Sequence, residues 1–191
     1  MFAILAFPGF CTISVLVESL VGQAPPLSAF STIAAHPAIL IQLVLIGIFL
    51  GALSEELGWL GYALDKFQAR WAPLPSALLL GVIWWAWHVP LFFTKGTTQN
   101  RWGFASPHFF LFFFWIVALS LLMTWLFNHN GRSTLLAVLV HFVSNFTLGL
   151  ILPISALGFL FLVVLLVAAA IAVVLSGGLR TPASAPRYPS G

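Results

Sequence analysis

Residues 39–53 read ILIQLVLIGIFLGAL, an apolar run without a charged side chain. Apolar sequence resumes after Ser54-Glu55-Glu56, where residues 57–64 read LGWLGYAL. A helix needs about 20 apolar residues to cross the hydrocarbon core of a bilayer. The whole segment therefore predicts a membrane-spanning helix over residues 38–67, with two adjacent glutamates inside it.

The composition of the chain also indicates an integral membrane protein. Of 191 residues, 61% are hydrophobic and only 6% are charged, whereas soluble domains carry about a quarter charged residues. Aromatic residues make up 15% of the chain, as suits a lipid-facing surface with aromatic belts. The net charge of +3 comes without a basic patch, so nothing indicates nucleic-acid binding.

Turn-forming residues divide the chain into about six apolar spans. We predict an all-α, polytopic transmembrane helix bundle over residues 1–176 and a disordered tail over residues 177–191, which are rich in Pro, Ser and Gly. The predicted helices cover residues 2–21, 38–67, 74–94, 107–128, 134–151 and 155–176.

The basic residues give an orientation, because cytoplasmic loops carry an excess of Lys and Arg. With six spans, five basic residues fall on one side of the membrane and two on the other. We therefore predict that both termini are cytoplasmic, in a bacterial inner membrane. The five are Lys66, Arg70, Arg132, Arg180 and Arg187, and the two are Lys95 and Arg101.

Five polar side chains stand inside the apolar segments and form the candidate site. Ionisable residues within a membrane are costly and normally face a cavity or a partner. His141 and Asn145 are four residues apart, which places them on one helix face. The five are Glu55, Glu56, His88, His141 and Asn145.

Each of these positions also has a simpler interpretation. Glu55 and Glu56 would lie among the lipid headgroups if their helix ended at Ser54. His88 follows three Trp residues and precedes Pro90 by two positions, which suits an interfacial or packed histidine. His141 and Asn145 could form a hydrogen-bonding patch between helices.

Depth in the membrane favours a single site. With a rise of ~1.5 Å per residue, Glu55 lies ~18 Å, His88 ~21 Å and Asn145 ~16 Å from the cytoplasmic side of a core ~30 Å thick. His141 lies ~10 Å deep on the same scale. We therefore expect these side chains to meet near the midplane.

The other three histidines lie next to prolines or in a polar turn. His36 precedes Pro37, His108 follows Pro107, and His129 lies between two asparagines. We interpret all three as solvated loop or boundary residues.

The polar positions fall into three motifs, E-E-x-x-x-L at 55–60, W-x-x-x-H at 84–88 and H-x-x-x-N at 141–145. In this order, on separate apolar helices, they resemble the EExxxR, FxxxH and HxxxN/D motifs of the CAAX protease and bacteriocin-processing family of intramembrane proteases. The resemblance spans roughly residues 40–150. Leu60 replaces the arginine of the first motif, and Trp84 replaces the phenylalanine of the second.

The resemblance implies an intramembrane endopeptidase that processes the C-termini of prenylated CAAX-type or other membrane-associated peptides. No Ser or Cys stands beside a base as a nucleophile, so direct attack by water is expected. Glu55 would act as general base with His88, while His141 and Asn145 would donate hydrogen bonds to the oxyanion. Glu56 would support these groups, and Trp59, Trp84 and Ser144 would support substrate or packing.

Two histidines and a glutamate also form the ligand set of many hydrolytic zinc sites, and the family is commonly labelled as metalloproteases. Glu55, His88 and His141 are therefore candidate ligands of Zn²⁺. A metal-free glutamate mechanism is the alternative.

Two other functions fit the same residues. Leu60 leaves open a non-enzymatic bacteriocin-immunity or scaffold protein. A small proton-coupled transporter could use buried Glu and His side chains as a relay, although no inverted repeat supports this reading. The sequence does not indicate an oligomeric state.

Overall fold

The computed structural model describes residues 2–23, 28–151 and 154–180, and all regular secondary structure in these ranges is helical. Four helices are long and apolar enough to cross a membrane, and two apolar helices are shorter. The predicted all-α transmembrane bundle is therefore confirmed. The long helices cover Pro37–Gln68, Pro73–Phe93, Pro107–His129 and Ala156–Leu175, and the shorter ones Ala6–Leu20 and Thr134–Leu150.

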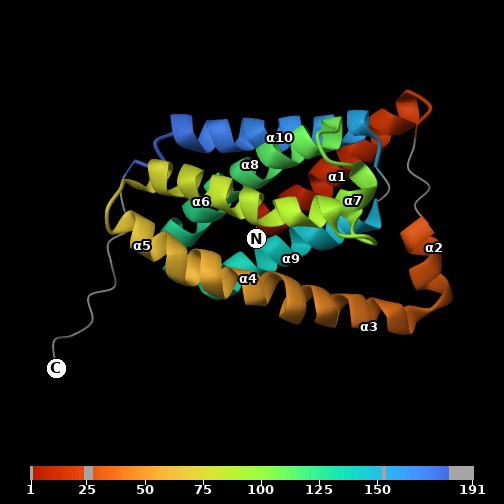
Figure 1. Ribbon diagram of the computed structural model, residues 1–191, viewed down its shortest axis with the longest axis horizontal. Helices are drawn as coiled ribbons and strands as arrows, with labels where there is room; N and C mark the ends of the chain where they lie inside the picture. Colours follow the sequence, from red (N-terminus) through yellow and green to blue (C-terminus); the bar gives the residue numbers. More distant parts are fainter. Residues whose placement is uncertain (1, 24–27, 152–153, 181–191) are drawn as a thin grey trace.

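The glutamates lie inside one continuous helix of 32 residues, Pro37–Gln68, which runs along one edge of the bundle (Figure 1). The helix does not end at Ser54, as the headgroup interpretation of Glu55 and Glu56 assumed. Two π-helical segments flank the α-helical turn that carries them, a feature frequent at functional sites. In order, the segments are α3 (Pro37–Ile46), η1 (Gly47–Ala52), α4 (Leu53–Gly58), η2 (Trp59–Ala63) and α5 (Leu64–Gln68).

The remaining long helices begin and end close to the predicted residues. The third predicted helix, however, is α-helical only to His88 and continues as the 3₁₀ segment η3 (Val89–Phe93), because Pro90 cannot donate a backbone hydrogen bond. The helices are α1 (Phe2–Leu20), α6 (Pro73–His88), α8 (Pro107–His129), α9 (Thr134–Leu150) and α10 (Ala156–Leu175).

Two short helices lie in segments where we predicted only breaks. They are α2 (Ser28–Ala35) and α7 (Thr98–Trp102). Both are too short to show an apolar period. The start of α7 is fixed by Thr97, whose hydroxyl accepts a hydrogen bond from the Asn100 backbone N–H at 3.1 Å, as N-cap residues do.

Glycines let the helices that carry the site approach closely. A Cβ at Gly81 of α6 would lie 2.9 Å from Val117 Cα of α8, and one at Gly47 of η1 would lie 3.0 Å from the Phe142 ring of α9. The Ser120 hydroxyl of α8 also donates to the Ala77 carbonyl of α6 at 2.9 Å. These contacts hold α6 against α8 and η1 against α9.

Most of the basic residues gather at one end of the bundle. Lys66 belongs to α5, Arg70 follows it, and Arg132, in the turn between α8 and α9, forms an ion pair with Asp65 of α5. The opposite end of the bundle carries α7 (Figure 1). The cytoplasmic assignment of the basic end stays a prediction.

Only the first residues of the predicted tail can be compared with the structure. Residues 177–180 form a turn after α10, in which Leu179 is buried. Arg187 and the rest of the tail, residues 181–191, lie outside the described residues.

Candidate active site

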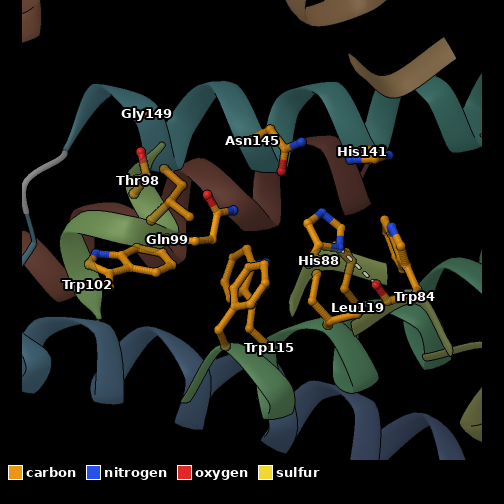
Figure 2. Close-up of a pocket in the computed structure, with 13 residues that line it drawn as sticks. Trp84, His88, Thr98, Gln99, Trp102, Trp115, Leu119, His141, Asn145 and Gly149 are labelled. Atoms are coloured by element: carbon orange, nitrogen blue, oxygen red, sulfur yellow. Dashed lines mark hydrogen bonds between the residues drawn. The ribbon is translucent and has the colours of Figure 1, made fainter. Parts of the chain in front are cut away.

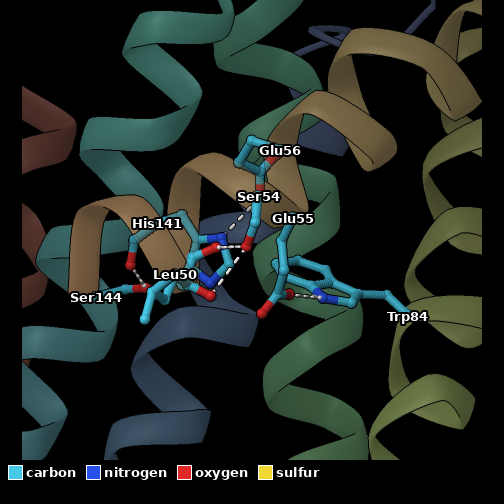
Figure 3. Close-up of polar contacts among 8 residues, drawn as sticks. Leu50, Ser54, Glu55, Glu56, Trp84, His141 and Ser144 are labelled. Carbon is cyan, nitrogen blue, oxygen red and sulfur yellow. Dashed lines mark hydrogen bonds and ion pairs between the residues drawn. The ribbon is translucent and has the colours of Figure 1, made fainter. Parts of the chain in front are cut away.

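Glu56 and His141 form a buried pair between α4 and α9. His141 Nδ1 lies 2.8 Å from Glu56 Oε1 (Figure 3), and neither residue is more than 2% exposed. A carboxylate can only accept, so Nδ1 carries the proton that is donated. This contact fixes the ring of His141 and leaves its Nε2 available for chemistry.

Glu55 points to a different partner from its neighbour. Its Oε2 accepts a hydrogen bond from the Trp84 indole N–H of α6 at 2.8 Å (Figure 3). No other hydrogen bond of Glu55 is found among the described residues. The carboxylate borders a small open pocket that Trp59 and Trp87 also line.

His88 is fixed by the backbone of its own helix. Its Nδ1 lies 2.9 Å from the Trp84 carbonyl oxygen, and since a carbonyl only accepts, Nδ1 is protonated and Nε2 is free. The ring packs edge-to-face on Trp87 and Phe112.

Trp84 is the residue that joins these groups. Its indole lies 5.2 Å from the His141 ring and 6.2 Å from the His88 ring, between centroids. It is 1% exposed, and its N–H holds Glu55. Trp59 packs against Trp84 at 6.4 Å and so supports its position.

A cavity of about 300 Å³ lies among α6, α7, α8 and α9. His88, His141 and Asn145 all line it (Figure 2), so the structure brings these three predicted residues together. Neither glutamate lines this cavity. Each glutamate instead contacts a residue that lines the cavity. Glu56 is hydrogen-bonded to His141, and Glu55 is hydrogen-bonded to Trp84.

Ser144 has a different place from the other predicted residues. Its hydroxyl donates to the His141 carbonyl at 2.8 Å, and the side chain is fully buried. It lines none of the pockets described in this section. Ser144 therefore serves packing within α9.

Leu60, at the position of the motif arginine, is fully buried and belongs to the hydrophobic core. An arginine in this site would need a buried partner for its charge. In this chain, the position contributes apolar packing.

The predicted zinc ligands do not form a metal site in this conformation. Among the residues that the structure describes, no group of three His, Cys, Asp or Glu side chains could hold a metal ion. Two hydrogen bonds direct these side chains to other partners. Glu55 accepts from the Trp84 indole, and His141 donates to Glu56. We therefore derive no step through a metal.

Sequence reasoning missed the cavity wall that α7 provides. Thr98, Gln99 and Trp102 line the cavity at the end away from His141 (Figure 2). No pattern in this short segment could identify them, because only the fold brings α7 over the cavity.

His108 is the second residue of α8, as the boundary interpretation expects, but it is half-buried and not freely solvated. Its Nε2 lies 3.1 Å from the Ile154 carbonyl, and its ring stacks on Trp102 and Phe159. It therefore packs behind α7.

Comparisons with known proteins show the family of this chain. Residues 36–147, more than half of the chain, match the family described as Type II CAAX prenyl endopeptidase Rce1-like. The chain belongs to this family of membrane proteases, and the resemblance inferred from the three motifs is confirmed.

A curated relative carries the name CAAX prenyl protease 2 and comes from Methanococcus maripaludis. It is 37% identical over 103 residues, which cover 53% of this chain. The match spans 38% of the relative's own length.

Proposed function

We propose that this protein is an intramembrane endopeptidase that cleaves a peptide bond near the C-terminus of a prenylated, CAAX-type substrate. One observation carries the proposal. Three polar side chains from two helices, His88, His141 and Asn145, line a single cavity, and Trp84, which also lines it, holds a glutamate beside it through its indole N–H. Family membership and the name of the relative agree with it.

Glu55 is the general base in this proposal. Trp84 engages only Oε2, so Oε1 can accept a proton from a water molecule. The free Nε2 of His88 binds the same water and orients it, because Nδ1 is committed to a carbonyl. The water oxygen attacks the scissile carbonyl carbon, and its proton passes to Glu55.

His141 and Asn145 stabilise the tetrahedral intermediate. A protonated Nε2 of His141 and the amide N–H of Asn145 donate to the oxyanion, while Glu56 stabilises the imidazolium from the opposite side. The proton held by Glu55 then passes to the leaving nitrogen, and the C–N bond breaks. The products are a new carboxylate and a new amine.

A neighbouring apolar cavity supports a lipidated substrate. It has a volume of about 280 Å³ and lies between the long helix and α9, where Phe142 and Phe146 form part of its wall. Asn145 and Gly149 line both cavities. A hydrocarbon chain in the apolar cavity would therefore lie directly beside a peptide in the polar one.

Cleavage of a farnesylated CAAX peptide by the purified protein in liposomes tests the proposal. We expect wild type to release the C-terminal fragment and Glu55→Gln to reduce kcat by about a hundred- to ten-thousandfold, as the loss of a general base does. Asp65→Asn, at the distant basic end, is the matched control and should keep wild-type activity. Full activity of Glu55→Gln would disprove the assignment.

The lipid part of the proposal has its own test at Gly149. A Cβ there meets no atom within 4 Å, so Gly149→Leu fits the fold but fills the junction of the two cavities. We expect a higher KM for the farnesylated peptide and an unchanged KM for the same peptide without the lipid. An equal effect on both peptides would contradict the apolar cavity as the lipid site.

A further inference from the structure

We infer that Gln99 and Arg101 of α7 form a subsite for the C-terminal carboxylate of the peptide substrate. The inference rests on the proposed function, since it extends the same cavity to the far end of the leaving fragment. The subsite makes the protein selective for a free chain end over a continuing or amidated chain.

Gln99 has an uncommitted amide that points into the cavity. Its side chain extends from α7 toward Asn145 (Figure 2). No hydrogen bond of this side chain is found among the described residues. A half-buried amide with free donors in a polar cavity is suited to bind an acceptor from a ligand.

Arg101 is exposed and does not line the cavity itself, but it supplies a positive charge next to the cavity wall. Its Nη2 donates to the Thr98 hydroxyl at 3.1 Å, and Thr98 lines the cavity. The guanidinium therefore lies within hydrogen-bond reach of the cavity wall. Four of its five N–H donors remain for a ligand, and the guanidinium fork matches a carboxylate.

Internal hydrogen bonds fix α7 relative to the site. The Thr97 hydroxyl donates to the Leu91 carbonyl at 2.6 Å, and the Asn100 amide donates to the Phe92 carbonyl at 2.9 Å. Both acceptors belong to η3, which directly continues the helix of His88. The distance between the reacting groups and the proposed carboxylate site is thus fixed, as a subsite that measures the length of a leaving fragment requires.

Charge at this end of the bundle favours an anion. The chain has only four acidic residues, of which Glu55 and Glu56 belong to the site and Asp65 lies at the opposite end. Glu18 is fully buried and accepts a hydrogen bond from the Ser155 backbone N–H at 2.9 Å. No exposed carboxylate therefore competes for Arg101 in the part of the chain that the structure describes.

The experiment compares two farnesylated peptides that differ only in a C-terminal carboxylate or carboxamide. With wild type, we expect KM to be about tenfold or more lower for the acid, because hydrogen bonds to a charged group are worth about 1.5–3 kcal/mol. In Arg101→Gln, this preference should fall to about one. Lys95→Gln removes the same charge from the same loop and should keep the preference.

Gln99→Glu is the sharper variant because it preserves size and places a carboxylate against the ligand's carboxylate. It should raise KM for the acid peptide by a larger factor than KM for the amide. Equal KM values for acid and amide with wild type would overturn the subsite and leave the protease assignment intact.

Cleavage of neither peptide would instead count against the proposed function. In that case, binding of the leaving fragment alone tests the subsite. The free tripeptide is added as its C-terminal acid or its C-terminal amide, and the thermal stabilisation of the full-length protein is measured. Stabilisation by the acid that Arg101→Gln abolishes supports the inference. Equal stabilisation by acid and amide overturns it.

Discussion

The indole N–H of Trp84 on α6 donates a 2.8 Å hydrogen bond to Oε2 of Glu55 on α4. The same indole lies against the rings of His88 and His141. Trp84 thus holds the proposed base in place beside the cavity that the histidines line. Its role is positioning, since Glu55 and His88 would contact the reacting water.

Trp84→Phe should lower kcat by about ten- to a hundredfold, because a hydrogen bond to a charged group is lost. The KM for the peptide should change little, since Phe keeps most of the packing. Steady-state cleavage of the farnesylated peptide measures both constants.

Trp85→Phe provides the matched control for this substitution. The Trp85 indole N–H is buried and makes no hydrogen bond to any residue that the structure describes, so its removal breaks none of these bonds. Equal losses of kcat in the two variants would show that packing, and not the hydrogen bond to Glu55, explains the effect.

The partner of His141 gives a second prediction. Glu56→Gln keeps an oxygen that can accept from Nδ1, whereas Glu56→Leu leaves this buried N–H without a partner at a cost of about 1–3 kcal/mol. We expect Glu56→Gln to fold with reduced kcat, and Glu56→Leu to have a lower unfolding temperature and no activity. Wild-type activity of Glu56→Leu would contradict the role of the pair.

The sequence predicted the helices well because their apolar runs are long and end at clear turn signals. It predicted that Glu55, His88, His141 and Asn145 would meet, because depth depends only on the rise per residue. It could not predict which partner each glutamate takes. Successive residues of a helix differ by about 100° around its axis, and the flanking π-helical segments alter that phase.

Leu60 gives a third prediction, about the departure from the family motif. Since this side chain is fully buried in the core, Leu60→Arg would bury a charge at a cost of several kcal/mol. We expect little folded protein from Leu60→Arg and near-normal yield from Leu60→Met, measured by size-exclusion chromatography in detergent. A folded and more active Leu60→Arg would show that the site can accommodate the motif arginine.

Metal removal gives a fourth prediction. Because no three candidate ligands converge in the described part of the chain, we expect cleavage to persist after prolonged treatment with 1,10-phenanthroline. Elemental analysis should find much less than one zinc per chain. One zinc per chain in wild type, lost in His141→Ala together with activity, would contradict this expectation.

Membrane orientation gives a fifth prediction. With the basic end in the cytoplasm, a cysteine at position 95 should react with an impermeant maleimide in intact cells, and one at position 70 only after permeabilisation. The natural Cys11 is buried and can be replaced by Ala as background. The reverse pattern would place α7, and the end of the cavity that it lines, on the cytoplasmic side.

The length of the helix that carries both glutamates makes membrane thickness important. At ~1.5 Å per residue, the 32 residues of Pro37–Gln68 extend about 48 Å, well beyond a hydrocarbon core of about 30 Å. Such a helix adapts by tilting or by thickening the surrounding lipid. A change in the tilt of this helix would move Glu55 relative to α6 and α9. The length of the lipid acyl chains would therefore change the distance between the proposed base and the two histidines.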